Sequence, residues 1–188
     1  MRINKSIFAA AMAAMTIFSA CSKDVQEENN DNEVVTTLEL HITEKGGSGE
    51  HFIYKFDDPD GFGAGTQPPV VDVVRLSANK VYDVELKLVN NTADPAEDVT
   101  GEVEDEAAAH RFYILPDATS NITVSGLNTD LNGVPLATAS VWTTGAPGAG
   151  KLRIVLRHYP DGGKATDDPV DSPKSSTDVD TEFATVIE

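Results

Sequence analysis

The sequence predicts an all-β fold, namely an antiparallel two-sheet sandwich of immunoglobulin-like type with one short helical crossover. From Val34 onward, apolar and polar residues alternate in about nine short runs, which is the pattern of half-buried strands. Only segment 96–110 breaks the alternation, because its acidic residues lead into three alanines and so indicate a short helix. The Cys…Trp…Cys core of true immunoglobulin domains is absent.

The individual runs give the predicted strands. In the first run, alternate residues share an apolar face: Val34, Thr36, Leu38, Leu40 and Ile42. Turn residues 44–49 separate this run from a second one at 52–56, so the two predict a hairpin. Segments 70–76 and 81–89 form the next predicted pair. After the helix we expect strands at 111–115, 121–126, 136–144, 151–159 and 179–187, with 161–177 as a long exposed loop.

The N-terminal residues predict the cellular location of the protein. Arg2 and Lys5, an apolar stretch and small residues before Cys21 form a bacterial lipoprotein signal, which predicts cleavage after Ala20 and acylation of Cys21, palmitate included. Residues 1–20 are thus the predicted signal peptide, 21–33 an acidic disordered tether and 34–188 the sandwich domain.

The acidic residues after Cys21 predict the location of the protein, and the net charge of the chain limits its partners. The acidic residues after Cys21 resemble the export tags of Bacteroidota surface lipoproteins, so we expect a lipid-anchored protein of the outer membrane, displayed on the cell surface. The chain has 14 basic and 31 acidic residues and a formal net charge of −17. Such a surface repels phosphate backbones, and we therefore expect no nucleic acid partner.

The glycine-rich segment 145–151 nearly completes a phosphate-binding loop. However, Leu152 stands where Ser or Thr should hold magnesium, and the following residues alternate as in a strand instead of starting a helix. We therefore interpret the segment as a hairpin turn and expect no nucleotide.

Two acidic turns offer oxygen ligands. Asp57, Asp58 and Asp60 precede the tight turn at Gly61, and calcium binds several hard oxygens of this kind. Segment 128–133 resembles the first half of an EF-hand loop, but it lacks the final glutamate, and ordinary hairpin chemistry explains it better. Calcium at the first turn is therefore the better candidate.

The four histidines fall into two groups. His41 and His51 lie on the polar faces of the first hairpin, whereas His110 and His158 have the parity of apolar side chains. His110 opens its predicted strand and His158 closes its own, so antiparallel pairing of the two strands would bring both imidazoles to one end of the sandwich. Such a cluster can hold zinc, copper or a haem iron. The alternative is that each histidine caps the edge of the core with a hydrogen bond.

Trp142, the only tryptophan, gives conflicting signals. Its partners in the alternation form the less apolar face of the strand, which favours an exposed ring that could serve as a sugar platform. Tryptophans are, however, highly buried on average, which favours the core. Both interpretations stay open.

Four groups of motifs together resemble a family of small Bacteroidota outer-membrane lipoproteins, often labelled type 1 periplasmic binding fold superfamily proteins. The resemblance covers residues 34–187 and rests on 58–61, on the acidic helix running into 110–113, on 143–145 with 156–160, and on 177–183. It implies an extracytoplasmic lipoprotein without an established enzymatic role. The label suggests an α/β fold, whereas the alternation in this chain predicts a nearly all-β one.

These observations favour a lipid-anchored, non-enzymatic module of the outer membrane that binds a ligand or partner at its loops. An outer-membrane transporter is a candidate partner, and the membrane itself is contacted through Cys21. One alternative is metal or haem capture by His110 and His158. Another, with the least support, is a surface polysaccharide hydrolase, because acids are too abundant in this chain for any pair to stand out.

Overall fold

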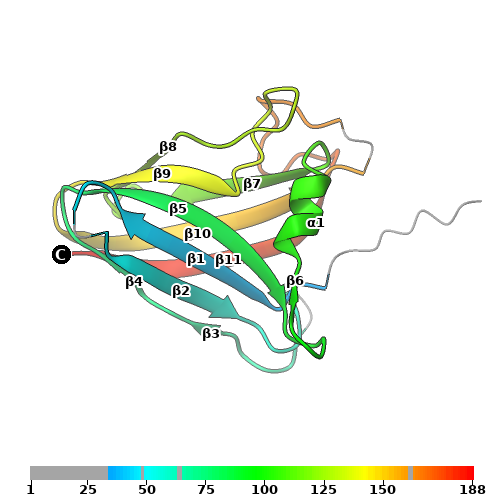
Figure 1. The fold of residues 1–188 in the computed structure, drawn as a ribbon, viewed down its shortest axis with the longest axis horizontal. Coiled ribbons are helices and arrows are strands. Elements are labelled where there is room, and N and C mark those ends of the chain that lie inside the picture. Colours follow the sequence, from blue (N-terminus) through cyan, green and yellow to red (C-terminus); the bar gives the residue numbers. More distant parts are fainter. Residues whose placement is uncertain (1–33, 48, 63–64, 161–162) are drawn as a thin grey trace, which may run out of the picture. The chain divides into compact units, whose positions relative to one another are not determined.

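The fold was analysed in a computed structural model, which describes residues 34–47, 49–62, 65–160 and 163–188. The predicted signal peptide, Cys21 and the tether lie outside these residues. Two β-sheets pack face to face, and one short helix lies at an end of the sandwich (Figure 1). The predicted all-β sandwich is therefore confirmed.

The larger sheet has seven strands in the described part of the chain. Its order is β3-β2-β1-β5-β9-β8, and β6 pairs with β5 beside this path. All of its strand pairs are antiparallel. The strands are β1 (Thr37–Glu44), β2 (His51–Asp57), β3 (Val70–Val71), β5 (Val81–Asn90), β6 (Glu97–Asp98), β8 (Ile122–Ser125) and β9 (Ala139–Thr144).

The smaller sheet has the order β4-β11-β10-β7. Its strands are β4 (Val74–Leu76), β7 (His110–Pro116), β10 (Gly148–His158) and β11 (Ser176–Ile187). β10 is antiparallel to both of its neighbours, whereas β4 and β11 are parallel.

Helix α1 (Thr100–Asp105) connects β6 of the larger sheet to β7 of the smaller one, as the predicted crossover requires. No helix in the described ranges is long and apolar enough to cross a membrane.

Two predicted hairpins were wrong, because each of these connections passes between the sheets. β4 and β5 are consecutive in the chain, but β4 pairs with β11 and β5 pairs with β1. The glycine-rich segment 145–151 likewise leaves β9 in the larger sheet and enters β10 in the smaller one. Alternation shows which face of a strand is buried, but it does not show which strand lies beside it.

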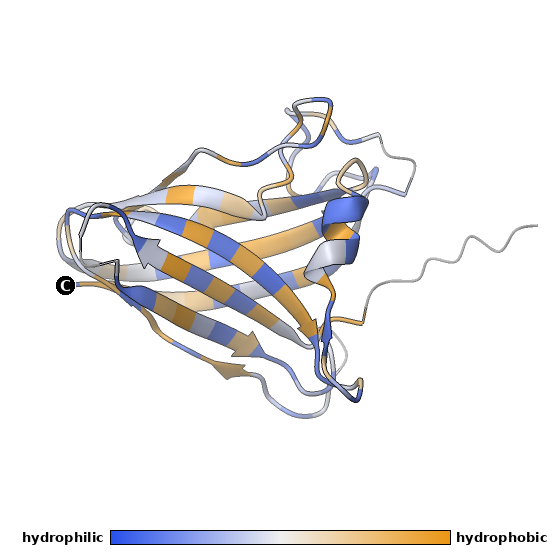
Figure 2. Ribbon diagram, viewed as in Figure 1, coloured by the Kyte–Doolittle hydropathy of each residue, from blue (hydrophilic) through white to orange (hydrophobic). Residues whose placement is uncertain are grey.

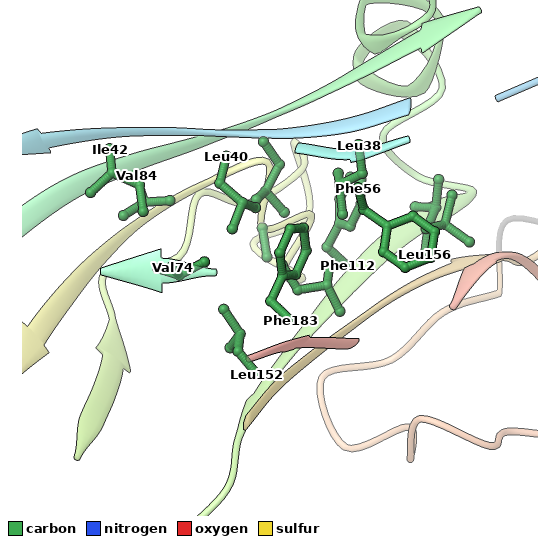
Figure 3. Packing of buried hydrophobic residues seen from close by; sticks show 14 of the residues in the cluster. Leu38, Leu40, Ile42, Phe56, Val74, Val84, Phe112, Leu152, Leu156 and Phe183 are labelled. Carbon is green, nitrogen blue, oxygen red and sulfur yellow. The ribbon is translucent and has the colours of Figure 1, made fainter. Parts of the chain in front are cut away.

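The core lies between the two sheets. Apolar and polar residues alternate along β1 and β5 (Figure 2), and the apolar set of β1, consisting of Leu38, Leu40 and Ile42, is fully buried as predicted. These side chains belong to one cluster with Leu156 and Phe183 of the smaller sheet (Figure 3). The core thus joins the two layers through the faces that the alternation predicted.

Trp142 belongs to this core. Its ring is fully buried, and its indole N–H donates to the hydroxyl oxygen of Ser140 at 2.9 Å. Ser140 made this face of β9 look polar in the sequence, yet its hydroxyl is what satisfies the buried indole. The sugar-platform interpretation therefore has no exposed ring to use.

We expect Phe183 to be a major contributor to stability. Its ring meets Phe56 of the other sheet edge-on, with the ring centroids 6.1 Å apart. Phe183→Ala should lower the free energy of unfolding by about 3–5 kcal/mol, because the ring's contacts are lost and a cavity remains. Chemical denaturation measures this change.

Leu131→Ala is the control, since Leu131 is fully exposed and its loss should change the free energy by less than about 0.5 kcal/mol. If Phe183→Ala behaved like this control, the packing described here would be incorrect.

Candidate metal centre

Two histidines meet at one end of the smaller sheet. β7 and β10 are antiparallel neighbours, and their register places His110 directly opposite His158. The two imidazole rings are stacked, with centroids 4.7 Å apart and planes inclined by 19°. The sequence predicted that the two imidazoles would lie together if their strands were antiparallel neighbours. The structure shows this arrangement.

Glu106 adds a carboxylate to this pair. It caps the C-terminal end of α1 and precedes the turn that leads into β7. Glu106, His110 and His158 each offer one ligand atom, and these atoms all lie within 4.8 Å of one another. Among the described residues, no other group of three or more His, Cys, Asp or Glu side chains meets this condition.

Glu106 was not predicted as a ligand, because in the sequence it is only one of several acids in the helical segment. The signal that could have found it is its spacing of four residues from His110. Residues four apart lie on the same side of a helical turn, so a carboxylate at that spacing is close to the imidazole.

A hydrogen bond orients the buried ring of His110. Its Nδ1 lies 3.3 Å from the backbone oxygen of Glu106. Because a carbonyl only accepts, Nδ1 carries the proton in this contact, and the lone pair of the neutral ring lies on Nε2. Metal-binding histidines are commonly oriented by a bond of this kind to a backbone carbonyl.

The three side chains differ in their access to solvent. His110 is fully buried, His158 is half-buried and Glu106 is exposed. Nδ1 of His158 is itself buried and has no hydrogen-bond partner among the described residues. An unsatisfied buried polar atom costs about 1–3 kcal/mol, and a bound ion or water would remove this cost.

The donor set suits a bare transition ion better than haem. Two imidazole nitrogens and one carboxylate oxygen are typical ligands for zinc, copper and nickel. Tetrahedral zinc separates its ligand atoms by roughly 3.3 Å, and the three candidate ligand atoms all lie within 4.8 Å of one another. A haem iron bound by both histidines would need them on opposite faces of the porphyrin, and the stacked rings of His110 and His158 leave no space for it between them.

A buried ion pair supports the backbone of His110. The side chains of Lys164 and Asp130 are only 1 % and 3 % exposed, and Nζ lies 3.3 Å from the carboxylate oxygen Oδ2. The ammonium also donates to the carbonyl oxygens of His110 at 2.9 Å and of Pro135 at 3.0 Å. Lys164 therefore joins three segments that are distant in the sequence.

The surroundings of this ion pair lower the pKa of both partners, for different reasons. Burial lowers the pKa of Lys164 and outweighs the attraction of Asp130. Burial also opposes ionisation of Asp130, but the backbone N–H groups of Val134 and Asn132, together with Lys164, lower the pKa of Asp130 below its ordinary value. Segment 128–133 thus uses its central carboxylate for its own turn, as the hairpin interpretation expected.

The segment after β10 is fastened to the sheet, although the sequence predicted a long exposed loop there. We call residues 163–175 the clamp loop. Arg111 donates to the carbonyl oxygen of Ala165 at 2.8 Å, and the hydroxyl of Tyr113 donates to that of Asp168 at 3.0 Å. Together with Lys164, these bonds hold the clamp loop against β7. The predicted loop is present between β10 and β11, and most of its described residues are exposed. Its composition did not predict these contacts, because glycine and proline content gives no information about cations on a neighbouring strand.

The predicted calcium turn uses its carboxylates internally. Asp57 accepts from a threonine hydroxyl of β1 at 2.5 Å, and Asp58 accepts the N–H of Asp60 at 3.3 Å. Asp60 accepts the backbone N–H groups of Gln67 and Thr66 at 2.8 and 2.7 Å, and these bonds lower the pKa of Asp60. In the described residues the structure does not bring these three carboxylates together as one ligand group.

His41 and His51 are cross-strand neighbours on β1 and β2, with ring centroids 5.5 Å apart. His41 lies 2.8 Å from a carboxylate oxygen of Glu39. This second pair therefore resembles the first in composition, but its side chains do not form a group of three ligands.

Fold and site together define a class: a β-sandwich with a three-ligand candidate metal centre at one end. In comparisons with known proteins, no family model, no curated protein and no solved structure matches this chain.

Asp130→Asn should destabilise the protein at neutral pH and lose this effect in acid. The folded state lowers the pKa of Asp130, so the ionised carboxylate stabilises the fold above its unfolded pKa of about 3.9. This contribution disappears as the pH falls through the folded pKa, since both states then bind the proton. Denaturation of both proteins at several pH values measures the difference, and a difference that stayed constant into strong acid would contradict the assignment.

Proposed function

We propose that this protein is a lipid-anchored, extracytoplasmic metal-binding protein that captures zinc or copper at Glu106, His110 and His158. The observation that carries the proposal is the convergence of three ligand atoms within 4.8 Å, two of them on stacked imidazoles. It favours the histidine-based alternative of the sequence analysis over an unspecified ligand at the loops. The proposed function is binding of the ion, and it includes no catalytic step.

The ligand number supports exchange of the ion. Structural zinc sites are almost always closed by four protein ligands. Here three protein ligands leave at least one position for water or for a donor from another molecule. The exposed Glu106 is the ligand that can leave or arrive first, whereas His110 is fixed in the core.

The charge of the chain supports the attraction of cations. A formal net charge of −17 raises the local concentration of cations over that of anions. Three further acids, Glu102, Glu104 and Asp105, lie on α1 immediately before Glu106. An ion that approaches the site therefore meets a negative surface first.

The proposed location rests on the sequence. The signal that ends at Cys21 and the acidic residues after it support an acylated protein of the outer membrane. An outer-membrane transporter is the partner that this location favours, because an anchored protein and a transporter share one membrane plane.

Metal titration of the full chain tests the proposed site. We expect Zn(II) or Cu(II) to bind and to raise the melting temperature, because ligands of the folded state stabilise it. His158→Ala and Glu106→Ala should each weaken binding by more than the about 10–100-fold that loss of an outer partner causes. Isothermal titration calorimetry measures the affinities.

The paired variant His41→Ala/His51→Ala is the matched control, since it removes two neighbouring histidines that also lie beside a glutamate. It should bind as tightly as the wild type. Equal weakening by this control would show non-specific binding, and hydrolytic activity of the zinc-loaded protein would replace capture with catalysis.

Acylation of Cys21 tests the proposed location separately. The protein purified from its own membranes should begin at an acylated Cys21, and Cys21→Ser should release the chain to the soluble fraction. Mass spectrometry and fractionation measure these two properties, with Ser22→Ala as the control. An unmodified thiol with residues 1–20 still attached would refute the anchor and leave the metal site to be judged alone.

A further inference from the structure

We propose that Lys164 is a positioning residue for the metal centre and acts through the backbone of His110. This inference rests on the proposed metal-binding function. The ammonium donates to the carbonyl oxygen of His110 at 2.9 Å, and its side chain is only 1 % exposed. One of the three candidate ligands is therefore held by a buried cation from the clamp loop.

A lysine at this position requires an explanation, because lysines are almost never fully buried unless they are paired. Packing alone does not explain it, since well-packed apolar side chains often replace a buried ion pair without loss of stability. A lysine differs from an apolar residue in that its N–H groups bond in defined directions. Two of its acceptors are the backbone carbonyls of His110 and Pro135, and the third is the carboxylate of Asp130.

These bonds complete the support of His110. Its ring is oriented by the bond from Nδ1 to the oxygen of Glu106, and the preceding carbonyl, that of Ala109, accepts the N–H of Tyr159 at 2.6 Å. Lys164 holds the carbonyl of His110 itself, so the backbone is fixed on both sides of the Cα atom. Supporting contacts of this kind set the position of a metal ligand, and their loss typically weakens metal affinity about 10–100-fold.

A purely electrostatic role for Lys164 predicts the opposite change in metal affinity. If Lys164 acted only through its charge, it would repel a bound cation, and its removal would strengthen metal binding. If Lys164 positions His110, its removal weakens binding. The direction of the change therefore separates the two roles.

The experiment compares Lys164→Met with the double variant Lys164→Met/Asp130→Asn in the full chain. The double variant removes both charges of the pair and so leaves the net charge unchanged. It should remain folded even if the single variant does not, because removal of a whole buried pair is often tolerated. We expect Zn(II) affinity to fall about 10-fold or more in the double variant, and the EPR spectrum of bound Cu(II) to change.

Lys174→Met is the matched control. It makes the same substitution in the same clamp loop, and it breaks an ion pair with Asp168 that is 2.9 Å long, with the lysine side chain 57 % exposed. This control should bind Zn(II) like the wild type and give an unchanged Cu(II) spectrum.

Each result supports or overturns the proposal. If the wild type binds neither ion, the proposed function fails and this inference falls with it. If the wild type binds but the double variant binds equally well with the same Cu(II) spectrum, Lys164 is not a positioning residue, although the proposed function stands. Tighter binding by Lys164→Met alone, which removes the positive charge and keeps Asp130, would assign a purely electrostatic role. Equal weakening by Lys174→Met would assign the effect to the clamp loop as a whole.

Discussion

The register between β7 and β10 is the constraint on which the candidate site depends. Side chains alternate between the faces of a strand, so a shift of one residue would place His110 and His158 on opposite faces of the sheet. The same register pairs Phe112 with Leu156, and both of these side chains are buried in the core. Slippage would expose them to water. Apolar packing along the strands therefore holds the two imidazoles together, and no attraction between the rings is needed.

The position of the site at a strand end follows from the cost of burying polar groups. In the middle of the sandwich an imidazole would need partners within an apolar layer. At the end, the C-cap of α1 supplies the carbonyl and the carboxylate of Glu106, and the clamp loop supplies the ammonium of Lys164, which donates to the carbonyl of His110. This arrangement lets one ligand, His110, be fully buried while another, Glu106, stays in contact with solvent. A buried ligand and an exposed one at the same site would suit the reversible ion capture that we propose.

The sequence predicted the faces of the strands well and their neighbours poorly. Leu38 and Leu40 are buried as the alternation predicted, but β4 and β5 proved to lie in different sheets. His110 and His158 could be predicted as partners only on condition that their strands paired. Lys164 could not be predicted as part of the site, because its acceptors come from β7 and from a turn about thirty residues away in the sequence, and no local pattern encodes such a contact.

The basic residues near the site explain why the acidic surplus of the chain remains available to cations. Several exposed lysines pair with carboxylates, as in the contacts between Lys151 and Glu182 and between Lys174 and Asp168. Arg111 and Arg157 instead donate to backbone carbonyls of the clamp loop, which lacks a strand partner for those groups. Guanidinium groups bound in this way order the loop without using any carboxylate as the acceptor. With 31 acidic residues against 14 basic ones, each cation that bonds to a carbonyl leaves one more carboxylate unpaired. The hydrogen bonds that the clamp loop needs therefore help to keep the surface negative, and a negative surface would attract the metal ion of the proposed function toward the histidines.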